Sequence, residues 1–337
     1  MLENRYAKQV LFQGIGPEGQ DKILRSTAAV IGVGALGTVI ATHLCRAGVG
    51  NLRLIDRDFV ERSNLQRQFL FDEQDAVERI PKAVAAAGKL RAVNSEITIE
   101  PVIADVTARN VEQLTRGADV IMDGTDNLET RFLINDAALK SGKPWVYGGA
   151  VGSHGMTMTI IPGQTPCLRC MMPEVPPPGS MPNCDTEGVL SAVTAAVASL
   201  QSAEALKVLT GKEPRRSLFM IDVWEGRFNE FTIYKRPECR ACGKGDYEYL
   251  GGARTSWTTV LCGRNAVQIV PPQERQIPLK EVQGRLARVG RTSFNGFLLA
   301  FEAEGRELTL FPTGRAIIRG TTDEAEARTF YAKYIGL

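Results

Sequence analysis

Residues 27–37 read TAAVIGVGALG, a short apolar run that leads directly into a glycine motif. Gly32, Gly34 and Gly37 form the pattern G-x-G-x-x-G between an expected strand and a helix expected from Thr38 to Cys45. Glycines at these positions let the backbone approach a nucleotide phosphate at the N-terminus of a helix. The stretch therefore predicts the first strand, loop and helix of a nucleotide-binding domain.

Residues 1–250 continue the alternation of strands and helices. We expect further strands over 52–55, 97–102, 119–122, 218–221 and 231–234, Gly-punctuated strands within 145–161, and helices over 111–115 and 186–209. Strands that alternate with helices imply right-handed βαβ units and a parallel sheet. The expected fold class is therefore α/β, with a Rossmann-like mixed, largely parallel sheet and helices on both faces.

A second, smaller domain is expected at the C-terminal end. After about Gly252 the pattern changes to expected strands over 297–301 and 308–311, followed by a helix over 323–334. The chain thus divides into a nucleotide-binding domain, residues 1–250, and a small α+β domain, residues 253–337, whose role the sequence leaves open.

The composition restricts the classes of partner. With 40 basic against 38 acidic residues the formal net charge is +2, so the chain lacks the basic excess of proteins that bind nucleic acid or anionic membranes. Residues 1–6 have no apolar segment behind their charges, and no later apolar run is expected to span a bilayer. We expect a cytoplasmic protein that binds neither nucleic acid nor membrane.

A cluster of polar and charged residues follows the glycine motif. Asp56 ends the second expected strand, where a carboxylate accepts hydrogen bonds from ribose hydroxyls. After Asp56 come Asp58, Asn64, Arg67, Gln68 and Lys82, a segment that places two cations and an amide near a nucleotide whose phosphates need neutralising. Displacement at phosphorus uses cations to stabilise charge on the phosphate oxygens, whereas hydride transfer has no need of them. The cluster favours an ATP-using enzyme over a nicotinamide-dependent oxidoreductase, although each cation taken singly fits a solvated face equally well.

A metal ligand is predicted in the loop after the strand over 119–122. Thr125-Asp126-Asn127 lies where a parallel sheet places its ligand crevice. Asp126 offers a hard oxygen ligand for Mg²⁺, which is held by one or two carboxylates together with substrate phosphates. Asn127 beside it is a candidate nucleotide-binding residue.

Two Cys-x-x-Cys pairs predict a second metal site. Cys167 and Cys170, with Cys239 and Cys242, supply four thiolates suited to a tetrahedral structural Zn²⁺. Redox chemistry at one pair is the alternative. A site whose four positions are filled by protein has no opening for substrate, so its expected role is to staple the end of the domain to the sheet.

Together these residues resemble a known group, the ubiquitin-activating-enzyme-like adenylyltransferases, especially the bacterial proteins that activate sulfur carriers for thiamine and molybdopterin synthesis. The resemblance covers about residues 1–245. It rests on Arg5-Tyr6-Ala7-Lys8-Gln9, GVGALG, Ala47-Gly48-Val49-Gly50, residues 64–68, Pro81-Lys82, Thr125-Asp126-Asn127 with Arg131, and both Cys pairs in order.

The resemblance implies a homodimer whose active sites bind ATP and Mg²⁺ and receive the C-terminal Gly-Gly tail of a ubiquitin-fold carrier protein. The carrier's carboxylate attacks the α-phosphate, which gives an acyl-adenylate and pyrophosphate. The implied roles place Asp56 on the ribose, Asn64, Arg67 and Lys82 around the phosphates, and Asp126 on the metal. A sulfurtransferase is a further candidate partner.

Two other residues carry expectations from the resemblance. Lys8 stands where the family usually has an arginine that reaches the neighbouring subunit's phosphates, and a lysine keeps the charge but loses the bidentate fork. Cys184 follows a proline-rich stretch at the start of the expected long helix, where a helix N-terminus favours a thiolate and the neighbouring Asp185 and Glu187 oppose it.

In some thiamine-pathway relatives a cysteine at the position matching Cys184 becomes covalently linked to the carrier. Cys184 is therefore a candidate catalytic thiol, and the alternative is a small residue packed at a helix start. A second alternative function is a non-catalytic scaffold that binds a ubiquitin-fold protein, favoured only by Lys8. Exchange of label between pyrophosphate and ATP in the presence of the carrier separates these functions.

Overall fold

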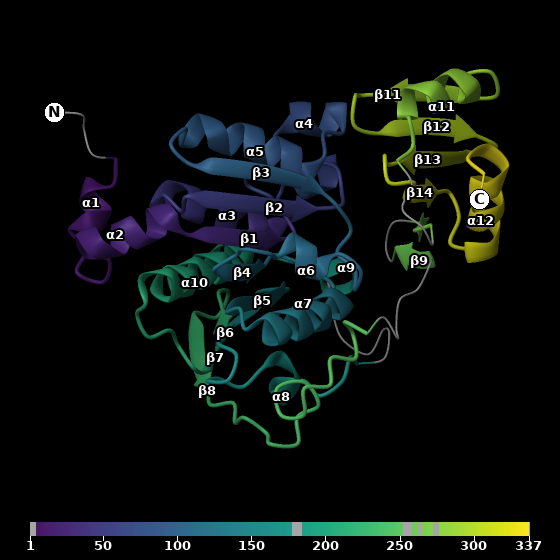
Figure 1. The fold of residues 1–337 in the computed structure, drawn as a ribbon. Coiled ribbons are helices and arrows are strands. Elements are labelled where there is room, and N and C mark those ends of the chain that lie inside the picture. Colours follow the sequence, from purple (N-terminus) through teal and green to yellow (C-terminus); the bar gives the residue numbers. More distant parts are fainter. Residues whose placement is uncertain (1–4, 177–183, 252–257, 262–264, 272–275, 337) are drawn as a thin grey trace. The chain divides into compact units, whose positions relative to one another are not determined.

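The computed structural model describes the chain except residues 1–4, 177–183, 252–257, 262–264, 272–275 and 337, and it describes only the backbone of residues 185 and 258–261. The chain forms two compact units, Met1–Ala253 and Arg254–Leu337 (Figure 1). The role of the second unit stays open.

The larger unit is built on an eight-stranded sheet with the order β3-β2-β1-β4-β5-β6-β7-β8. Its strands are β1 (Thr27–Ile31), β2 (Asn51–Asp56), β3 (Thr98–Ile103), β4 (Val120–Asp123), β5 (Trp145–Val151), β6 (His154–Ile160), β7 (Leu218–Asp222) and β8 (Arg227–Phe231). β1 to β5 run parallel, and β6, β7 and β8 extend the sheet antiparallel. The predicted α/β class with a mixed, largely parallel sheet is confirmed.

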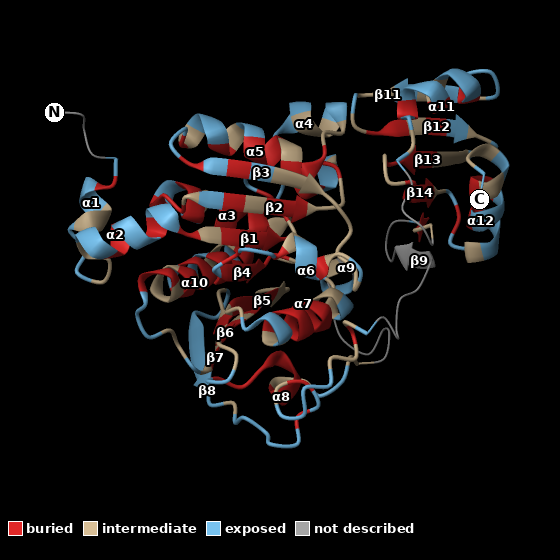
Figure 2. Cartoon of the chain, in the orientation of Figure 1, coloured by how far each residue is buried: buried red, intermediate tan, exposed pale blue. Residues whose placement is uncertain are grey.

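Helices cover both faces of this sheet. They are α1 (Ala7–Val10), α2 (Gly16–Arg25), α3 (Ala35–Ala47), η1 (Arg62–Asn64), α4 (Glu73–Glu78), α5 (Lys82–Val93), α6 (Val111–Leu114), α7 (Leu128–Ser141), α8 (Leu168–Met171), α9 (Cys184–Glu187) and α10 (Ser191–Thr210). The buried β1 alternates between the faces, as its two-residue period requires. Ala28 and Val30 join one hydrophobic core with α3, α5 and α10, while Ala29 and Ile31 join the other with α7 (Figure 2).

The helix predicted over Thr38 to Cys45 begins earlier, at Ala35 within the glycine motif, and is closed by Gly48 as predicted. Gly34 is the N-cap of α3, and Gly48 ends the helix in the left-handed region with φ +84°. Glycine adopts this conformation without the steric cost that a Cβ carries. β1 and α3 are thereby joined by the short loop that carries the motif.

The prediction of one helix over 186–209 was wrong. Gly188 has φ +71° and separates α9 from α10. The amide of Gly152 donates to the carbonyl of Gly188 at 2.9 Å, and the amide of Leu190 donates to the carbonyl of Gly152 at 2.8 Å. The helical pattern is broken because this short segment pairs with the turn after β5.

The last strand was also misplaced, over 231–234 instead of Arg227–Phe231. Every residue of β8 is exposed, because β8 is the outer edge of the sheet. A strand with both faces in solvent has no alternating pattern of apolar residues by which its bounds could be predicted.

One helix meets the length and composition of a membrane span, contrary to the prediction that no apolar run does. α10 has 20 residues, and an 18-residue stretch of it has a mean hydropathy of 1.2 and is 50% buried inside the chain. It packs against α3, β5 and β6 and buries the polar side chains of Gln201 and Glu204. These contacts are those of a core helix.

The smaller unit is an antiparallel sheet with two helices on one face. Its elements are β9 (Thr258–Leu261), β10 (Ala266–Ile269), α11 (Leu279–Leu286), β11 (Arg291–Phe294), β12 (Leu299–Ala303), β13 (Arg306–Leu310), β14 (Ala316–Arg319) and α12 (Glu324–Tyr334). The strand order is β11-β12-β13-β14-β10-β9. Leu286 and Phe330, from the two helices, pack with Phe301 in a single core.

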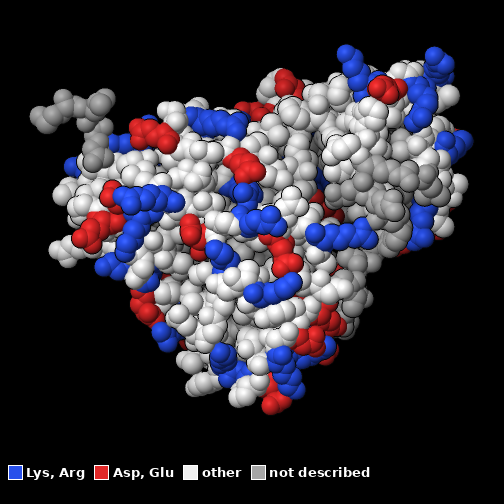
Figure 3. All heavy atoms as spheres, viewed as in Figure 1, with Lys and Arg blue, Asp and Glu red and all other residues white. Residues whose placement is uncertain are grey.

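Charges of both signs are interspersed on the surface of the larger unit that Figure 3 shows. The expected absence of nucleic-acid and membrane partners, and the cytoplasmic location, stay predictions.

Candidate nucleotide site

The carboxyl ends of three neighbouring parallel strands bring the predicted nucleotide-site residues to one edge of the sheet. The amide of Gly32, after β1, donates to Ile55 at the end of β2 at 2.8 Å. The amide of Gly124, after β4, donates to Ile31 at 2.8 Å. Ligands of open α/β sheets bind beyond such strand ends.

The three glycines of the motif have different structural roles. A Cβ on Gly32 would lie 2.7 Å from backbone atoms of Gly124, and a Cβ on Gly37 would lie 1.9 Å from the carbonyl oxygen of Gly32. A Cβ on Gly34 would meet no atom nearer than Nε2 of Gln68, at 3.8 Å. Gly32 and Gly37 thus allow two loops to pack backbone against backbone, whereas Gly34 leaves space at the N-terminus of α3.

Asp56 and Asp58 are fixed close to a buried lysine. The carboxylate of Asp56 accepts hydrogen bonds from the amides of Val33 and Asp58, each at 2.7 Å. The Lys82 ammonium lies 3.8 Å from the Asp58 carboxylate, and its side chain is only 6% exposed. Burial raises the pKa of Asp56, and the charge of Lys82 opposes that rise. The structure therefore brings together all three of these predicted site residues.

The segment that begins with η1 places two amides inside and a cation toward solvent. Asn64 is buried, and its Oδ1 accepts a hydrogen bond from the amide of Glu61 at 3.1 Å. Gln68 is also buried, and its Oε1 has no hydrogen-bond partner among the described residues. Arg67 donates to the carbonyl of Ser63 at 3.0 Å. A buried amide oxygen without a partner is costly, so it indicates a polar ligand beside Gly34.

A buried ion pair shapes the loop of the predicted metal ligand. Arg131 donates to Asp123 at 2.9 Å, to the carbonyl of Thr125 at 2.5 Å and to that of Gly148 at 2.8 Å. Burial alone lowers the pKa of Arg131, but Asp123, Tyr147 and Asp126 raise it above its ordinary value. The buried Arg131 therefore fixes the position of the loop between Asp123 and α7.

Asp126 and Asn127 differ in what they offer a ligand. Asp126 is exposed at the tip of this loop, where its carboxylate is available to a metal ion. Asn127 is the N-cap of α7, and its Oδ1 accepts a hydrogen bond from the amide of Thr130 at 3.0 Å. Asn127 therefore has a structural role as the cap of α7, and its role in nucleotide binding stays a prediction.

Arg57 is a charged residue of this edge that the sequence reasoning missed. Its guanidinium donates to Asp105 at 3.0 Å and lies 4.0 Å from the carboxylate of Asp58. Burial alone lowers the pKa of Arg57, but Asp105, Asp58 and Asp126 together raise it above its ordinary value. Its place between Asp56 and Asp58 was the available signal.

Lys8 does not belong to this edge within one chain. It is an exposed residue of α1, which packs on α2. α2 leads directly into the beginning of β1, so α1 lies toward the opposite end of the strands (Figure 1). Contact between Lys8 and a nucleotide would require a second copy of the chain.

Cys184 reaches the same side of the sheet as the nucleotide edge. It is half-buried in α9, and its Sγ lies 3.5 Å from the carbonyl oxygen of Ala150, near the end of β5. Gly148 of the same strand accepts the hydrogen bond from Arg131. Residues 177–183, which include the end of the proline-rich stretch, lie outside the described residues.

The two Cys pairs converge on one point. Sγ of Cys167 lies 3.6 Å from that of Cys239, Sγ of Cys170 lies 3.4 Å from that of Cys242, and all four sulfurs lie within 4.8 Å of one another. A tetrahedral Zn²⁺ with Zn–S bonds of about 2.3 Å separates its sulfurs by about 3.8 Å. Contact with Cys242 raises the pKa of Cys167, and burial raises that of Cys170, so four thiolates there call for a cation. The geometry fits a four-sulfur metal site.

Large apolar side chains project from the outer edge of the sheet. Phe228 and Phe231 of β8 are 68% and 47% exposed, and the flanking Trp224 and Tyr234 are 76% and 78% exposed. Figure 2 shows β8 as an exposed strand. Phe228 and Phe231 pair with Ile221 and Leu218, which join the two different cores, so their rings lie on opposite faces of β8. Exposed apolar side chains along a sheet edge mark a candidate partner surface.

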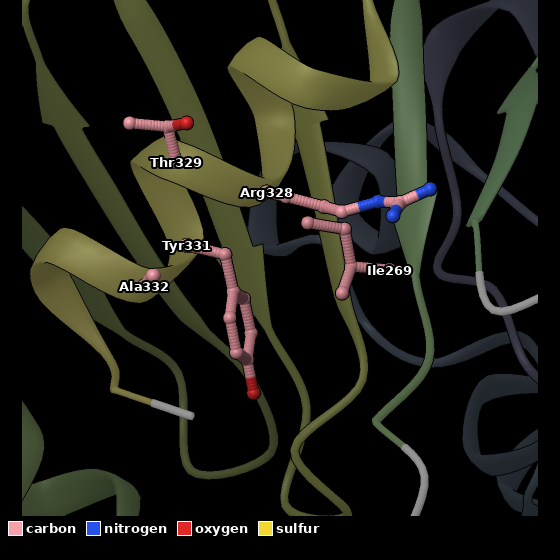
Figure 4. Close-up of a pocket in the computed structure, with 5 residues that line it drawn as sticks. All are labelled: Ile269, Arg328, Thr329, Tyr331 and Ala332. Atoms are coloured by element: carbon pink, nitrogen blue, oxygen red, sulfur yellow. The ribbon is translucent and has the colours of Figure 1, made fainter.

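The smaller unit has a pocket of about 260 Å³ beside α12. Ile269, Arg328, Thr329, Tyr331 and Ala332 line it. Figure 4 shows Arg328 extending from the helix past Ile269, and the hydroxyl of Tyr331 donates to the carbonyl of Gly314 at 2.8 Å. The lining is mainly hydrocarbon, so the pocket does not have the character of a reactive site.

Residues 6–241 match the model described as ThiF family. The chain is 42% identical over 338 residues to the sulfur carrier protein ThiS adenylyltransferase of Bacillus subtilis, across 99% of this chain and all of that relative. It is 37% identical to the sulfur carrier protein adenylyltransferase of Thermus thermophilus, across 74% of this chain and 97% of that relative. It is 38% identical to the SAMP-activating enzyme E1 of Haloferax volcanii, across 73% of this chain and 91% of that relative.

Solved structures share the fold of the larger part of the chain. The crystal structure of Escherichia coli MccB with ATP superposes with a TM-score of 0.63 and 23% identity, over 72% of this chain and 75% of that one. The match to the Thermus relative covers almost all of that relative but leaves about a quarter of this chain unmatched. The match to the Bacillus relative covers almost the whole of this chain.

Proposed function

The chain belongs to the ThiF family, which confirms the resemblance drawn from its motifs, and on that premise we propose that it adenylates the C-terminal carboxylate of a ubiquitin-fold sulfur-carrier protein. ATP and Mg²⁺ are the proposed co-substrate and metal. The carboxylate oxygen bonds to the α-phosphorus and the bond to the β-phosphate oxygen breaks, which gives acyl-adenylate and pyrophosphate. The Bacillus relative's name makes a ThiS-type carrier with a Gly-Gly tail the first candidate.

One observation carries this proposal: cations, carboxylates and an unsatisfied buried amide lie together at the N-terminus of α3. Asp56 would bind the ribose, while Asp58, Asn64 and Gln68 would line the nucleotide. The partnerless Oε1 of Gln68 supports a polar ligand there, and the open space at Gly34 leaves room for phosphates.

The proposed chemical step depends on compensation of charge at the phosphates. Lys82 is buried beside Asp58, so its ammonium is held in place before the substrate arrives. Arg67 donates to the local carbonyl of Ser63, and its guanidinium could turn from there toward the leaving pyrophosphate. Asp126 would hold Mg²⁺, which neutralises phosphate charge when bound. Lys8 would supply a further cation from the second subunit of a homodimer.

The exposed aromatic residues of β8 and its flanks are the proposed docking surface for the carrier. They lie on the antiparallel end of the sheet, and β6 and β7 lead from there to Gly152 and the turn beside Cys184. A folded carrier bound at this edge could therefore extend its tail along the strand ends toward the nucleotide. The apolar surface provides affinity, and the tail provides the reacting group.

A second step on Cys184 is part of the proposal. Its thiolate would attack the acyl carbon of the adenylate, so that a C–S bond forms and AMP leaves, which gives a thioester. The position of the thiol near the end of β5 supports this step. A sulfurtransferase is the proposed source of sulfur for the activated carrier.

The four-cysteine cluster is proposed to hold a structural Zn²⁺. Asn135 of α7 accepts a hydrogen bond from the amide of Leu168 at 3.0 Å, within the first Cys pair. The metal would thus staple the segment around Cys239 and Cys242 to α7, the helix capped by Asn127. No position remains for a substrate, which supports a structural role.

Exchange of labelled pyrophosphate into ATP tests the proposal. With a purified ThiS-type carrier, the chain should return label to ATP, and a carrier lacking its final glycine should give none. Absence of exchange with carriers that bind the chain would support the scaffold alternative. The nicotinamide-dependent alternative has no support among the relatives compared, which are named as adenylyltransferases or as an activating enzyme.

A further inference from the structure

Arg57 stands among carboxylates at the nucleotide edge, and the proposed reaction does not use it. Its guanidinium donates to Asp105 at 3.0 Å and lies 4.0 Å from Asp58. Asp105 follows β3 and Asp58 follows β2, so Arg57 bridges two loops at the ends of neighbouring strands. Its side chain is 30% exposed, so it is partly accessible to solvent at this edge.

The proposed metal ligand Asp126 follows β4, which is separated from β2 in the sheet by β1 alone, so Asp126 and Arg57 stand at the same edge. The charge of Asp126 is among those that raise the pKa of Arg57. The guanidinium of Arg131 is instead committed to Asp123 and to two carbonyls in the interior. Arg57, in contrast, faces carboxylates of the loops at this edge, Asp105 and Asp58.

A fixed positive charge beside a carboxylate has opposite effects on two ligands. It repels a free divalent cation, because the cation and the guanidinium compete for the same carboxylate. It attracts a metal that arrives on a triphosphate, because that complex carries net negative charge. At 4.0 Å, the separation of Arg57 from Asp58, one such charge changes affinity by at least about fivefold, the value for bulk water, and by more near a protein surface.

We propose that Arg57 is an internal counter-ion that keeps Asp126 and Asp58 from binding a free divalent cation, so that the metal enters the site together with the phosphates of ATP. This inference rests on the proposed function for the identity of the nucleotide. Arg57 is a positioning residue in this scheme, since it acts through Asp126 and Asp58.

Binding of Mn²⁺ to the full chain, followed by electron paramagnetic resonance, tests the inference without catalysis. Arg57→Gln removes the charge and keeps a donor for Asp105. Free Mn²⁺ should bind this variant at least about fivefold more tightly than the wild type, while Mn²⁺ with a non-hydrolysable ATP analogue should bind more weakly. Arg57→Lys, which restores the charge, should behave as the wild type.

Arg53→Gln is the matched control. Arg53 lies earlier on β2 and pairs with Glu100 at 2.8 Å, so its removal changes net charge equally without touching the nucleotide edge. It should leave both affinities unchanged. An equal gain in free Mn²⁺ affinity in Arg53→Gln and Arg57→Gln, or none in Arg57→Gln, would overturn the inference.

Arg57→Gln combined with Asp105→Asn keeps the test decisive if Arg57→Gln does not fold, because the double variant has no unpaired carboxylate at position 105. Free Mn²⁺ should still bind this double variant more tightly than the wild type. Wild-type affinity for free Mn²⁺ in the double variant would contradict the inference. Lack of carrier-dependent exchange in the wild type would instead overturn the proposed function and leave these metal titrations readable.

Discussion

The guanidinium of Arg131 donates to the carboxylate of Asp123 at 2.9 Å, and their side chains are only 9% and 0% exposed. Asp123 also accepts hydrogen bonds from the amide and hydroxyl of Thr125, at 2.9 and 2.8 Å. This pair links the end of β4 to α7 and holds the loop on which Asp126 stands.

Loss of one partner of this pair should destabilise the larger unit strongly. Arg131→Met leaves the Asp123 carboxylate buried without its counter-charge, so the free energy of unfolding should fall by about 3–5 kcal/mol. Denaturant titration measures the change. Arg25→Met, which breaks the exposed pair with Asp21, should cost less than about 1 kcal/mol. Equal effects of the two substitutions would contradict the structural role of Arg131.

Arg67→Ala and Asp126→Ala should abolish carrier-dependent pyrophosphate exchange and leave the fold intact. Both side chains are solvent-accessible, and each is proposed to act on charge at the phosphates, so the loss should be about a hundredfold or more. Circular dichroism verifies the fold. Arg62→Ala, in the same segment at an exposed position, should retain exchange. Normal exchange by Arg67→Ala or Asp126→Ala would remove that residue from the site.

The purified chain should carry about one zinc ion, because four sulfurs within 4.8 Å form a closed tetrahedral site. Elemental analysis measures it. Cys239→Ser should lower the zinc content and the melting temperature together, whereas Cys45→Ser, outside the cluster, should keep the zinc. Freshly reduced protein with no zinc and four titratable thiols would count against the assignment.

Cys184→Ala should keep pyrophosphate exchange but form no covalent adduct with the carrier, because adenylation itself uses no thiol. Intact mass spectrometry without reductant, during turnover with the true carrier, detects the adduct. Cys45→Ala should still form the adduct, since Cys45 is buried and its Sγ contacts the carbonyl of Leu90 in α5. If the wild type forms no adduct, Cys184 is a structural residue and the reaction ends at the acyl-adenylate.

The stability of the larger unit should depend on pH through Asp136. Burial raises the pKa of Asp136 to about 6, above its ordinary value of 3.8. Between these values the folded chain binds a proton that the unfolded chain does not, so the free energy of unfolding should fall as the pH rises from about 4 to 6. The loss amounts to at most about 3 kcal/mol.

Asp136→Asn isolates this contribution. Its oxygen can still accept the hydrogen bond from the amide of Tyr249, which the native carboxylate accepts at 2.9 Å. The difference between the wild type and Asp136→Asn, measured by denaturant titration across this range, should change with pH and become constant above about pH 7. A difference that does not vary with pH would show that Asp136 titrates normally.

Local chemistry made much of the first unit predictable. The apolar run before Gly32, the helix that ends at Gly48 and the strand that ends at Asp56 have patterns that depend on nearby residues alone. The proximity of Asp56, Asp58 and Lys82 could also be predicted. A strand of a parallel sheet ends, and the helix that follows it begins, at the same edge of the sheet. The break at Gly188 was not predictable in this way, since it depends on pairing with Gly152.

By itself, the sequence determined the α/β class, the family and the edge of the sheet at which the predicted site residues gather, because these depend on the periodicity of apolar residues and on motifs of fixed spacing. Only the tertiary structure decided that Gly32 and Gly37 serve backbone packing while Gly34 leaves space, and that Arg57 faces Asp105 and Asp58. It also decided that the oxygen of Gln68 has no partner among the described residues. These features are contacts between loops that follow different strands. Which side chains meet there depends on the order and twist of the sheet, and no local pattern carries that information.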